Sequence, residues 1–212
     1  MSNEGVPPAH QDQPQLMILL GWFVIFGCAA LALSILIADF VVPDHDWIAD
    51  TISDLGAGRF EFIVDIGLYT YSAAVLSAAL LAAHVHMGDR GWSIGILALL
   101  VFGLTVFLIG ARNEYGDADS DGWVIHKYLV YALGAAVATV AFAMAKGLKR
   151  ADARYSYALQ GFGALWVVGA PVFFFLPNDI DGLYERGLGV LASGILITLA
   201  IFFIRRGHAL GR

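Results

Sequence analysis

Charged residues are scarce in this sequence, and their scarcity excludes a large class of proteins. Only 14% of the 212 residues are Asp, Glu, Lys or Arg, whereas 59% are hydrophobic. A soluble domain carries about 25% charged residues. So few charges cannot cover the apolar side chains of a water-soluble fold. The composition therefore excludes a soluble globular protein and requires the lipid bilayer as solvent.

Cysteine and basic residues are also in short supply. The single cysteine, Cys28, excludes an intramolecular disulfide. Residues 1–15 contain no Lys or Arg, so they lack the basic segment with which a signal peptide begins. The net charge of −6 argues against a nucleic-acid partner, because such proteins present basic patches. We expect residues 1–15 to form a polar N-terminal tail.

The sequence contains six long apolar runs. Each is close to the length of about 20 residues that crosses the hydrocarbon core of a bilayer. The runs are Leu16–Ala38, Phe62–Ala83, Trp92–Ala111, Trp123–Ala145, Tyr155–Leu176 and Leu183–Ile204. In lipid every backbone N–H and C=O must be satisfied within its own segment, so each run is expected to be a helix. The sequence predicts an all-α polytopic membrane protein, with an antiparallel bundle of six transmembrane helices over residues 16–206 and a short C-terminal tail over 207–212.

Small residues and one proline refine this expectation. Gly134 in the fourth run, and Gly161 and Gly163 in the fifth, predict close approach between helices, because small residues let two backbones pack tightly. Pro171 predicts a kink near the end of the fifth run, since proline cannot donate the helical hydrogen bond.

Basic residues gather on one side of the predicted bundle. Eight of the twelve Lys and Arg residues fall there: Arg90, Lys146, Lys149, Arg150, Arg154, Arg205, Arg206 and Arg212. Cytoplasmic loops of membrane proteins carry an excess of Lys and Arg. We therefore expect this side and both termini to be cytoplasmic, in a multi-pass protein of the cell membrane.

The opposite side collects the carboxylates. Fourteen of the eighteen Asp and Glu residues belong to it: Asp39, Asp44, Asp46, Asp50, Asp54, Glu61, Asp65, Glu114, Asp117, Asp119, Asp121, Asp179, Asp181 and Glu185. An acidic extracytoplasmic face of this kind favours binding of a cation or of a partner protein. Membrane lipid surrounds it in either case.

One stretch of this face resembles half of a calcium-binding loop. Asp117, Asp119, Asp121 and the glycine after them spell D-x-D-x-D-G, in which three carboxylates and a sharp turn wrap a Ca²⁺ ion. The twelfth loop position is Tyr128 instead of the bidentate Glu, so a full EF-hand is absent. The sequence predicts a Ca²⁺ site formed by these three aspartates with Glu185 from another loop. A solvated acidic turn is the alternative.

Short motifs resemble those of a known membrane family. Asp50–Gly58 reads DTISDLGAG, Asn113–Glu114 follows the third run, His126 opens the fourth, and Gly182–Arg186, GLYER, opens the sixth. In these positions the chain resembles an uncharacterised archaeal and bacterial membrane family, catalogued as domain of unknown function nine hundred and ninety-eight. The resemblance covers residues 16–206, although Arg112 stands where the family has a proline. It implies six spans and no particular reaction.

Three residues are candidates for chemistry at the acidic side. Asp54 and His126 could serve as acid–base groups or metal ligands of a metal-dependent hydrolase that acts on lipid at the outer leaflet. Asp65 lies within the second run, where a carboxylate is costly and needs a partner or a watery cavity. Lys127 and Arg186 are the expected partners of Asp65.

These observations leave three functions open. The first is a protein without enzymatic activity whose acidic face binds a cation or a partner. The second is the lipid-directed hydrolase, with Asp54, Asp65 and His126 as its reacting groups. The third is a small transporter coupled to protons or ions through Asp65. A cavity that converges on His126 and Asp54 would favour the hydrolase, whereas an aqueous route past Asp65 to the cytoplasmic side would favour transport.

Overall fold

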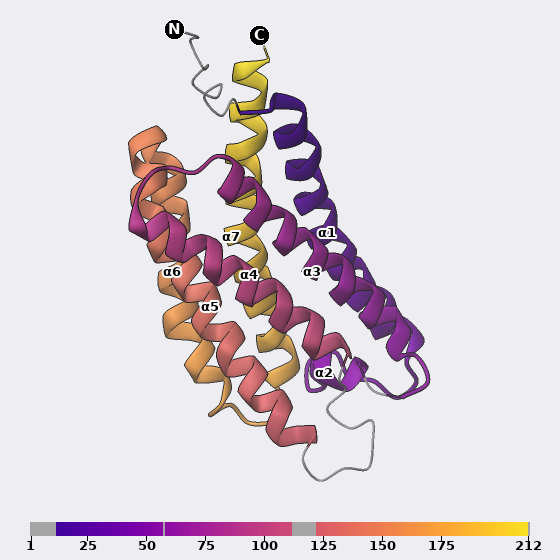
Figure 1. Ribbon diagram of the computed structural model, residues 1–212. Helices are drawn as coiled ribbons and strands as arrows, with labels where there is room; N and C mark the ends of the chain where they lie inside the picture. Colours follow the sequence, from indigo (N-terminus) through magenta and orange to yellow (C-terminus); the bar gives the residue numbers. More distant parts are fainter. Residues whose placement is uncertain (1–11, 57, 112–121, 212) are drawn as a thin grey trace, which may run out of the picture.

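The chain folds into one bundle of long helices (Figure 1). A computed structural model describes residues 12–56, 58–111 and 122–211, without the side chains of residues 122–125. The helices in chain order are α1 Pro14–Val41, α2 Ile52–Leu55, α3 Glu61–His84, α4 Arg90–Ala111, α5 Gly122–Ala151, α6 Ala153–Phe173 and α7 Asp181–Leu210. All except α2 are long and apolar enough to cross a membrane, and the described residues include no strand. The prediction of an all-α protein with six transmembrane helices is confirmed.

The ends of some helices differ from the predicted runs. α6 ends at Phe173, two residues after Pro171, so the proline lies in the last turn of this helix. Residues 174–176, which the sequence assigned to the fifth transmembrane helix, lie outside it in a turn and bend. α7 continues to Leu210, so the expected C-terminal tail is mostly helical. The short α2 lies in a loop that the hydropathy pattern left without structure.

The six long helices form a closed ring. Each packs against its neighbours along the chain, in the order α1, α3, α4, α5, α6 and α7, and α7 returns to α1. α3 and α7 also touch across the ring. Both ends of the described chain, at Asp12 and Gly211, lie at the same end of the bundle, and α2 lies at the other (Figure 1).

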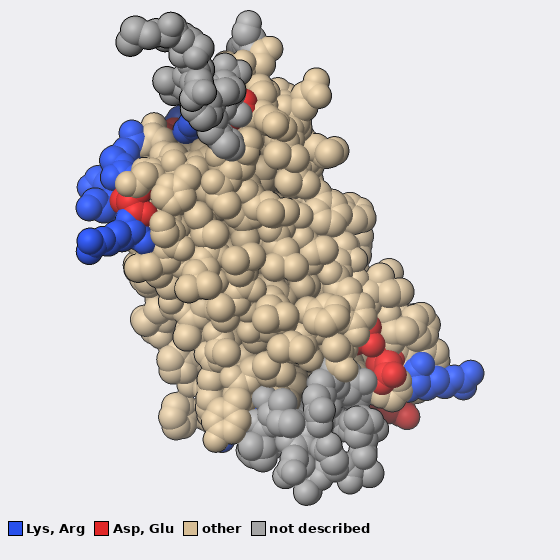
Figure 2. All heavy atoms as spheres, in the orientation of Figure 1, with Lys and Arg blue, Asp and Glu red and all other residues tan. Residues whose placement is uncertain are grey.

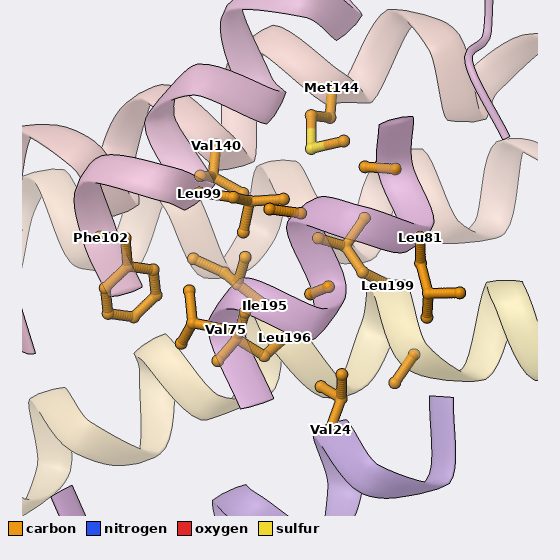
Figure 3. Packing of buried hydrophobic residues seen from close by; sticks show 14 of the residues in the cluster. Val24, Val75, Leu81, Leu99, Phe102, Val140, Met144, Ile195, Leu196 and Leu199 are labelled. Carbon is orange, nitrogen blue, oxygen red and sulfur yellow. The ribbon is translucent and has the colours of Figure 1, made fainter. Parts of the chain in front are cut away.

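One half of the ring is filled by an apolar core. Side chains from all six long helices contribute to it, among them Val75, Leu99, Val140 and Ile195, which are fully buried (Figure 3). Gly163 permits close approach, because a Cβ atom on it would lie 2.6 Å from that of Ala141. Gly134 and Gly161 do not have the predicted packing role, since no described atom lies within 4 Å of a Cβ built there.

Charged side chains gather at the two ends of the bundle, with an uncharged band between them on the face drawn in Figure 2. We call the end with Lys149, Arg150 and Arg154 the basic end. The end that carries α2 and the loops around Asp46 and Asp179 is the acidic end.

At the basic end, Asp89 joins the start of α4 to α5. Its Oδ1 accepts a hydrogen bond from the Trp92 N–H at 2.7 Å, which caps the first turn of α4. Its other oxygen pairs with Arg150 of α5. The Trp92 N–H, with a smaller contribution from Arg150, holds the pKa of Asp89 below its ordinary value.

Two exposed residues at opposite ends of the bundle allow a direct test of its orientation in the membrane. Arg59 at the acidic end and Lys149 at the basic end are both exposed, and the native Cys28 is buried. We expect a membrane-impermeant thiol reagent, applied to intact cells, to label Arg59→Cys and spare Lys149→Cys in a Cys28→Ala background, because Lys and Arg favour the cytoplasmic side. Labelling of Lys149→Cys alone would invert the predicted orientation.

Candidate functional site

Arg186 connects three parts of the acidic end. It lies in the second turn of α7, and its Nη2 donates to Oδ1 of Asp39, near the end of α1, at 2.5 Å. Its Nη1 donates to the carbonyl oxygens of Asp50 and Gly182, each at 2.9 Å. Both members of the ion pair are 14% exposed, so they are largely withdrawn from water. One guanidinium thus joins α1, α7 and the loop between α1 and α2.

His45 and Gly182 complete this junction. His45, whose side chain is 3% exposed, places Nε2 3.1 Å from Asp39 Oδ1 and Nδ1 3.3 Å from Asp50 Oδ2. The Leu183 N–H donates to the Ile48 carbonyl at 2.9 Å. A Cβ atom on Gly182 would collide with the backbone at Asp50, so only glycine allows the loop to lie against the start of α7.

The junction positions α2, whose first turn is capped from two directions. The Thr51 hydroxyl accepts from the Asp54 N–H at 3.2 Å, and Asp54 Oδ2 accepts from the Thr51 N–H at 2.7 Å, which is a capping box. Glu185 of α7 adds a further cap, because its Oε2 accepts from the Ile52 N–H at 2.6 Å. These bonds fix α2 against α7.

A cavity of about 1050 Å³ opens inside the ring at the acidic end. Its polar lining comes from the α1–α2 loop, the α6–α7 loop and helices α2, α3, α5 and α7: Asp50, Thr51, Ser53, Asp54, Asp65, His126, Lys127, Asn178, Asp181 and Glu185. Its apolar lining includes Ile52, Phe174 and Phe175 beside these polar groups, and further along the helices Tyr71, Phe102, Val137 and Trp166. The cavity is therefore amphipathic, with polar groups only near the loops and an apolar deeper part.

The structure brings together several residues that the sequence singled out. Asp54, Asp65, His126 and Glu185 all line this cavity, although they come from four different helices. Asp54 and Glu185 are engaged in the caps of α2. His126 places Nε2 3.1 Å from the hydroxyl oxygen of Ser53.

One of the two partners predicted for Asp65 is contradicted, and the other stays a prediction. Arg186 is not its partner, because the guanidinium is committed to Asp39 and to backbone carbonyls. Lys127, the other expected partner, lines the same cavity as Asp65. Oδ1 of Asp65 and Oδ1 of Asp181 are buried, and no group in the described part of the chain hydrogen-bonds to either. A buried polar atom without a partner calls for an explanation such as a bound ligand, ion or water.

The predicted calcium site falls largely outside the described residues. Asp117, Asp119 and Asp121 belong to the segment 112–121, so their convergence on a cation stays a prediction. Within 12–56, 58–111 and 122–211, no three His, Cys, Asp or Glu side chains are grouped as metal ligands.

Two features of the site escaped sequence reasoning. The Thr51-Ile-Ser-Asp54 segment carries the spacing of a capping box, which is a readable signal for the start of a helix. The pairing of Arg186 with Asp39 has no such signal, because the two residues are 147 positions apart.

The Arg186 junction should dominate the stability of the acidic end. We expect Arg186→Met to lower the free energy of unfolding by about 3–5 kcal/mol, since it leaves the Asp39 carboxylate buried without its cation. Unfolding in mixed detergent micelles, followed by circular dichroism, measures the loss. Asp39→Asn in the same chain should recover part of it.

Arg154→Met provides the matched control. Arg154 pairs with Asp152 at the basic end, but its side chain is 80% exposed, so its loss should leave the free energy of unfolding nearly unchanged, because exposed ion pairs contribute little. Equal effects of the two substitutions would show that the Arg186 junction has no special weight.

Comparison with known proteins identifies a family and nothing beyond it. The family described as protein of unknown function (DUF998) matches residues 23–201. No curated protein and no solved structure matches the chain. Among the motifs that carry the resemblance, residues of Thr51–Gly56, His126 and Glu185 of the Gly182–Arg186 motif line the cavity, whereas Asn113–Glu114 lies outside the described residues. The match covers most of the chain, and the protein belongs to the DUF998 family.

Proposed function

We propose that this multi-pass membrane protein binds an amphiphile with a positively charged headgroup in the cavity at its acidic end. The observation that carries the proposal is the lining of the cavity, whose polar groups all lie near the loops and whose deeper part within the ring is apolar. An amphiphile is divided in the same way, because it consists of a polar headgroup and an apolar hydrocarbon chain. The volume of about 1050 Å³ is at the upper end of the range for small-molecule sites, as a chain-bearing ligand needs.

The charge of the headgroup follows from the polar lining. Its described carboxylates are Asp50, Asp54, Asp65, Asp181 and Glu185, against the single ammonium group of Lys127. Asp54 and Glu185 already cap α2, whereas Oδ1 of Asp65 and Oδ1 of Asp181 are buried and accept no hydrogen bond from the described residues. An ammonium headgroup supplies N–H donors and positive charge to these oxygens, and both would otherwise carry a desolvation cost.

The apolar part of the cavity suits a hydrocarbon chain. Phe102 of α4 and Val137 of α5 line it, and nearly one turn further along these helices Leu99 and Val140 are fully buried in the core. The core thus fills the ring toward the basic end. This packing favours binding over transport, because transport through Asp65 requires a route past the same residues.

The acidic end is also the end that the distribution of Lys and Arg predicts to be extracytoplasmic. With that orientation, the ligand would come from the outer leaflet of the cell membrane. The leading hypothesis from the sequence, an acidic face that binds a cation, thereby becomes specific in two respects. The cation is part of an amphiphile, and it lies inside the bundle at the membrane boundary.

Octadecylamine in nonionic detergent tests the headgroup. We expect it to raise the melting temperature of the purified protein more than octadecanol does, because only the amine carries charge. Asp181→Asn and Asp65→Asn should each weaken amine binding about tenfold, equivalent to about 1.4 kcal/mol. Asp44→Asn is the matched control, since Asp44 lies at the same end, is exposed and does not line the cavity.

Two glycines of α7 test the chain-binding part in the same assay. A Cβ at either Gly187 or Gly189 meets no described atom within 4 Å, but only Gly189 lines the cavity. Gly189→Phe should therefore abolish the shift produced by the amine, whereas Gly187→Phe should leave it unchanged. A wild-type protein whose melting temperature is indifferent to octadecylamine would refute the proposal, and so would equal shifts in the two Phe variants.

A further inference from the structure

We propose that Ser53 and His126 form a nucleophile–base pair that cleaves the ester of an amphiphile held in this cavity. The Ser53 hydroxyl oxygen and His126 Nε2 are 3.1 Å apart, within the reach of a hydrogen bond, and both residues line the cavity. A serine becomes a useful nucleophile when an adjacent base takes its proton. The inference rests on the proposed function, because it assigns a reaction to the amphiphile that the cavity binds.

The local structure leaves the Ser53 hydroxyl available for this contact. A serine at the start of a helix usually caps backbone N–H groups. Here Thr51 and Glu185 already perform that task for Asp54 and Ile52. The Ser53 side chain instead reaches α5, from which His126 projects, across 73 positions of the sequence. The capping bonds also hold Ser53 in place, as a reacting group requires.

The chemistry balances with water as the second reactant. With the proton of the neutral imidazole on Nδ1, His126 Nε2 accepts the Ser53 proton while Oγ attacks the ester carbonyl carbon. The tetrahedral intermediate breaks its bond to the alkoxy oxygen, and the alcohol leaves with the proton from His126. Water then attacks the acyl-serine, His126 again takes and returns the proton, and a carboxylic acid departs from the restored Ser53.

The cavity selects the substrate class. The carboxylates bind a cationic headgroup, and the apolar part of the cavity holds a hydrocarbon chain. An ester bond between headgroup and chain therefore lies beside the polar lining, where Ser53 and His126 are. Lys127 lies next to His126 along α5, and its ammonium supplies positive charge to the same lining, where the oxyanion of the intermediate develops. The substrate class is therefore an acyl ester with a cationic head.

A fluorescent long-chain fluorophosphonate reports an activated serine directly. The reagent should label the purified wild-type protein, and peptide mapping should place the label on Ser53. Ser53→Ala should abolish labelling, and His126→Gln should slow it about a hundredfold, the scale of general base catalysis. A second pair within the chain is the control. Ser93 lies 2.9 Å from His86 Nε2, but this pair is exposed at the basic end, outside the cavity, and should stay unlabelled.

Hydrolysis of 2-(dimethylamino)ethyl palmitate, whose protonated amine keeps an N–H donor, is measured beside octadecylamine binding and separates this inference from the proposed function. Wild type should release 2-(dimethylamino)ethanol, Ser53→Ala should release less than one hundredth as much, and both should keep the shift in melting temperature produced by octadecylamine. If the wild-type protein binds the amine but is neither labelled nor hydrolytic, the nucleophile–base pair is overturned and the proposed function stands. Labelling of Ser93 in place of Ser53 overturns the pair too. A wild type that does not respond to the amine contradicts the proposed function itself.

Discussion

The ion pair between Arg186 and Asp39 closes the ring of helices at its acidic end, and the site depends on this closure. Apolar helices in lipid gain little from covering one another, because the surrounding chains are as apolar as their own side chains. Close packing, as between Gly21 and Ile204, and polar contacts therefore join the last helix to the first. At the basic end the Arg206–Asp12 pair and the close approach of Gly207 to Pro14 do so. At the acidic end the junction is made by one guanidinium, which binds α1, the first loop and α7 together.

Closure by a polar group has a consequence for the interior. Because Arg186 draws the loop at Asp50 against α7, the short helix α2 is placed over the ring, where Glu185 caps it. The interior at this end is consequently lined with polar groups, whereas the other half of the ring is filled by side chains such as Leu99 and Ile195. Half of the bundle serves as a packed base and the other half encloses a cavity.

The polar groups of the cavity divide into two sets by what they bind. Thr51, Asp54 and Glu185 satisfy one another or the backbone of α2, and their role in the fold is complete. Asp65 and Asp181 each keep a buried oxygen to which no described group donates, and the Ser53 hydroxyl oxygen lies 3.1 Å from His126 Nε2. The functional proposals rest on the second set, because its buried oxygens and its Ser–His contact lie at the cavity.

The sequence by itself determined the six helices, since the requirement to satisfy each backbone group in lipid acts within a single segment. It also determined that carboxylates and basic residues would gather at opposite ends, and its short motifs indicated the family. It did not determine which charged groups meet. Arg186 was one of two partners expected for Asp65 and instead forms an ion pair with Asp39. Ser53 lies within hydrogen-bond distance of His126, 73 positions away in the sequence. Such pairings depend on how each helix is rotated about its axis and on where the first loop is anchored. Both are set by contacts between distant segments, so only the tertiary structure could decide them.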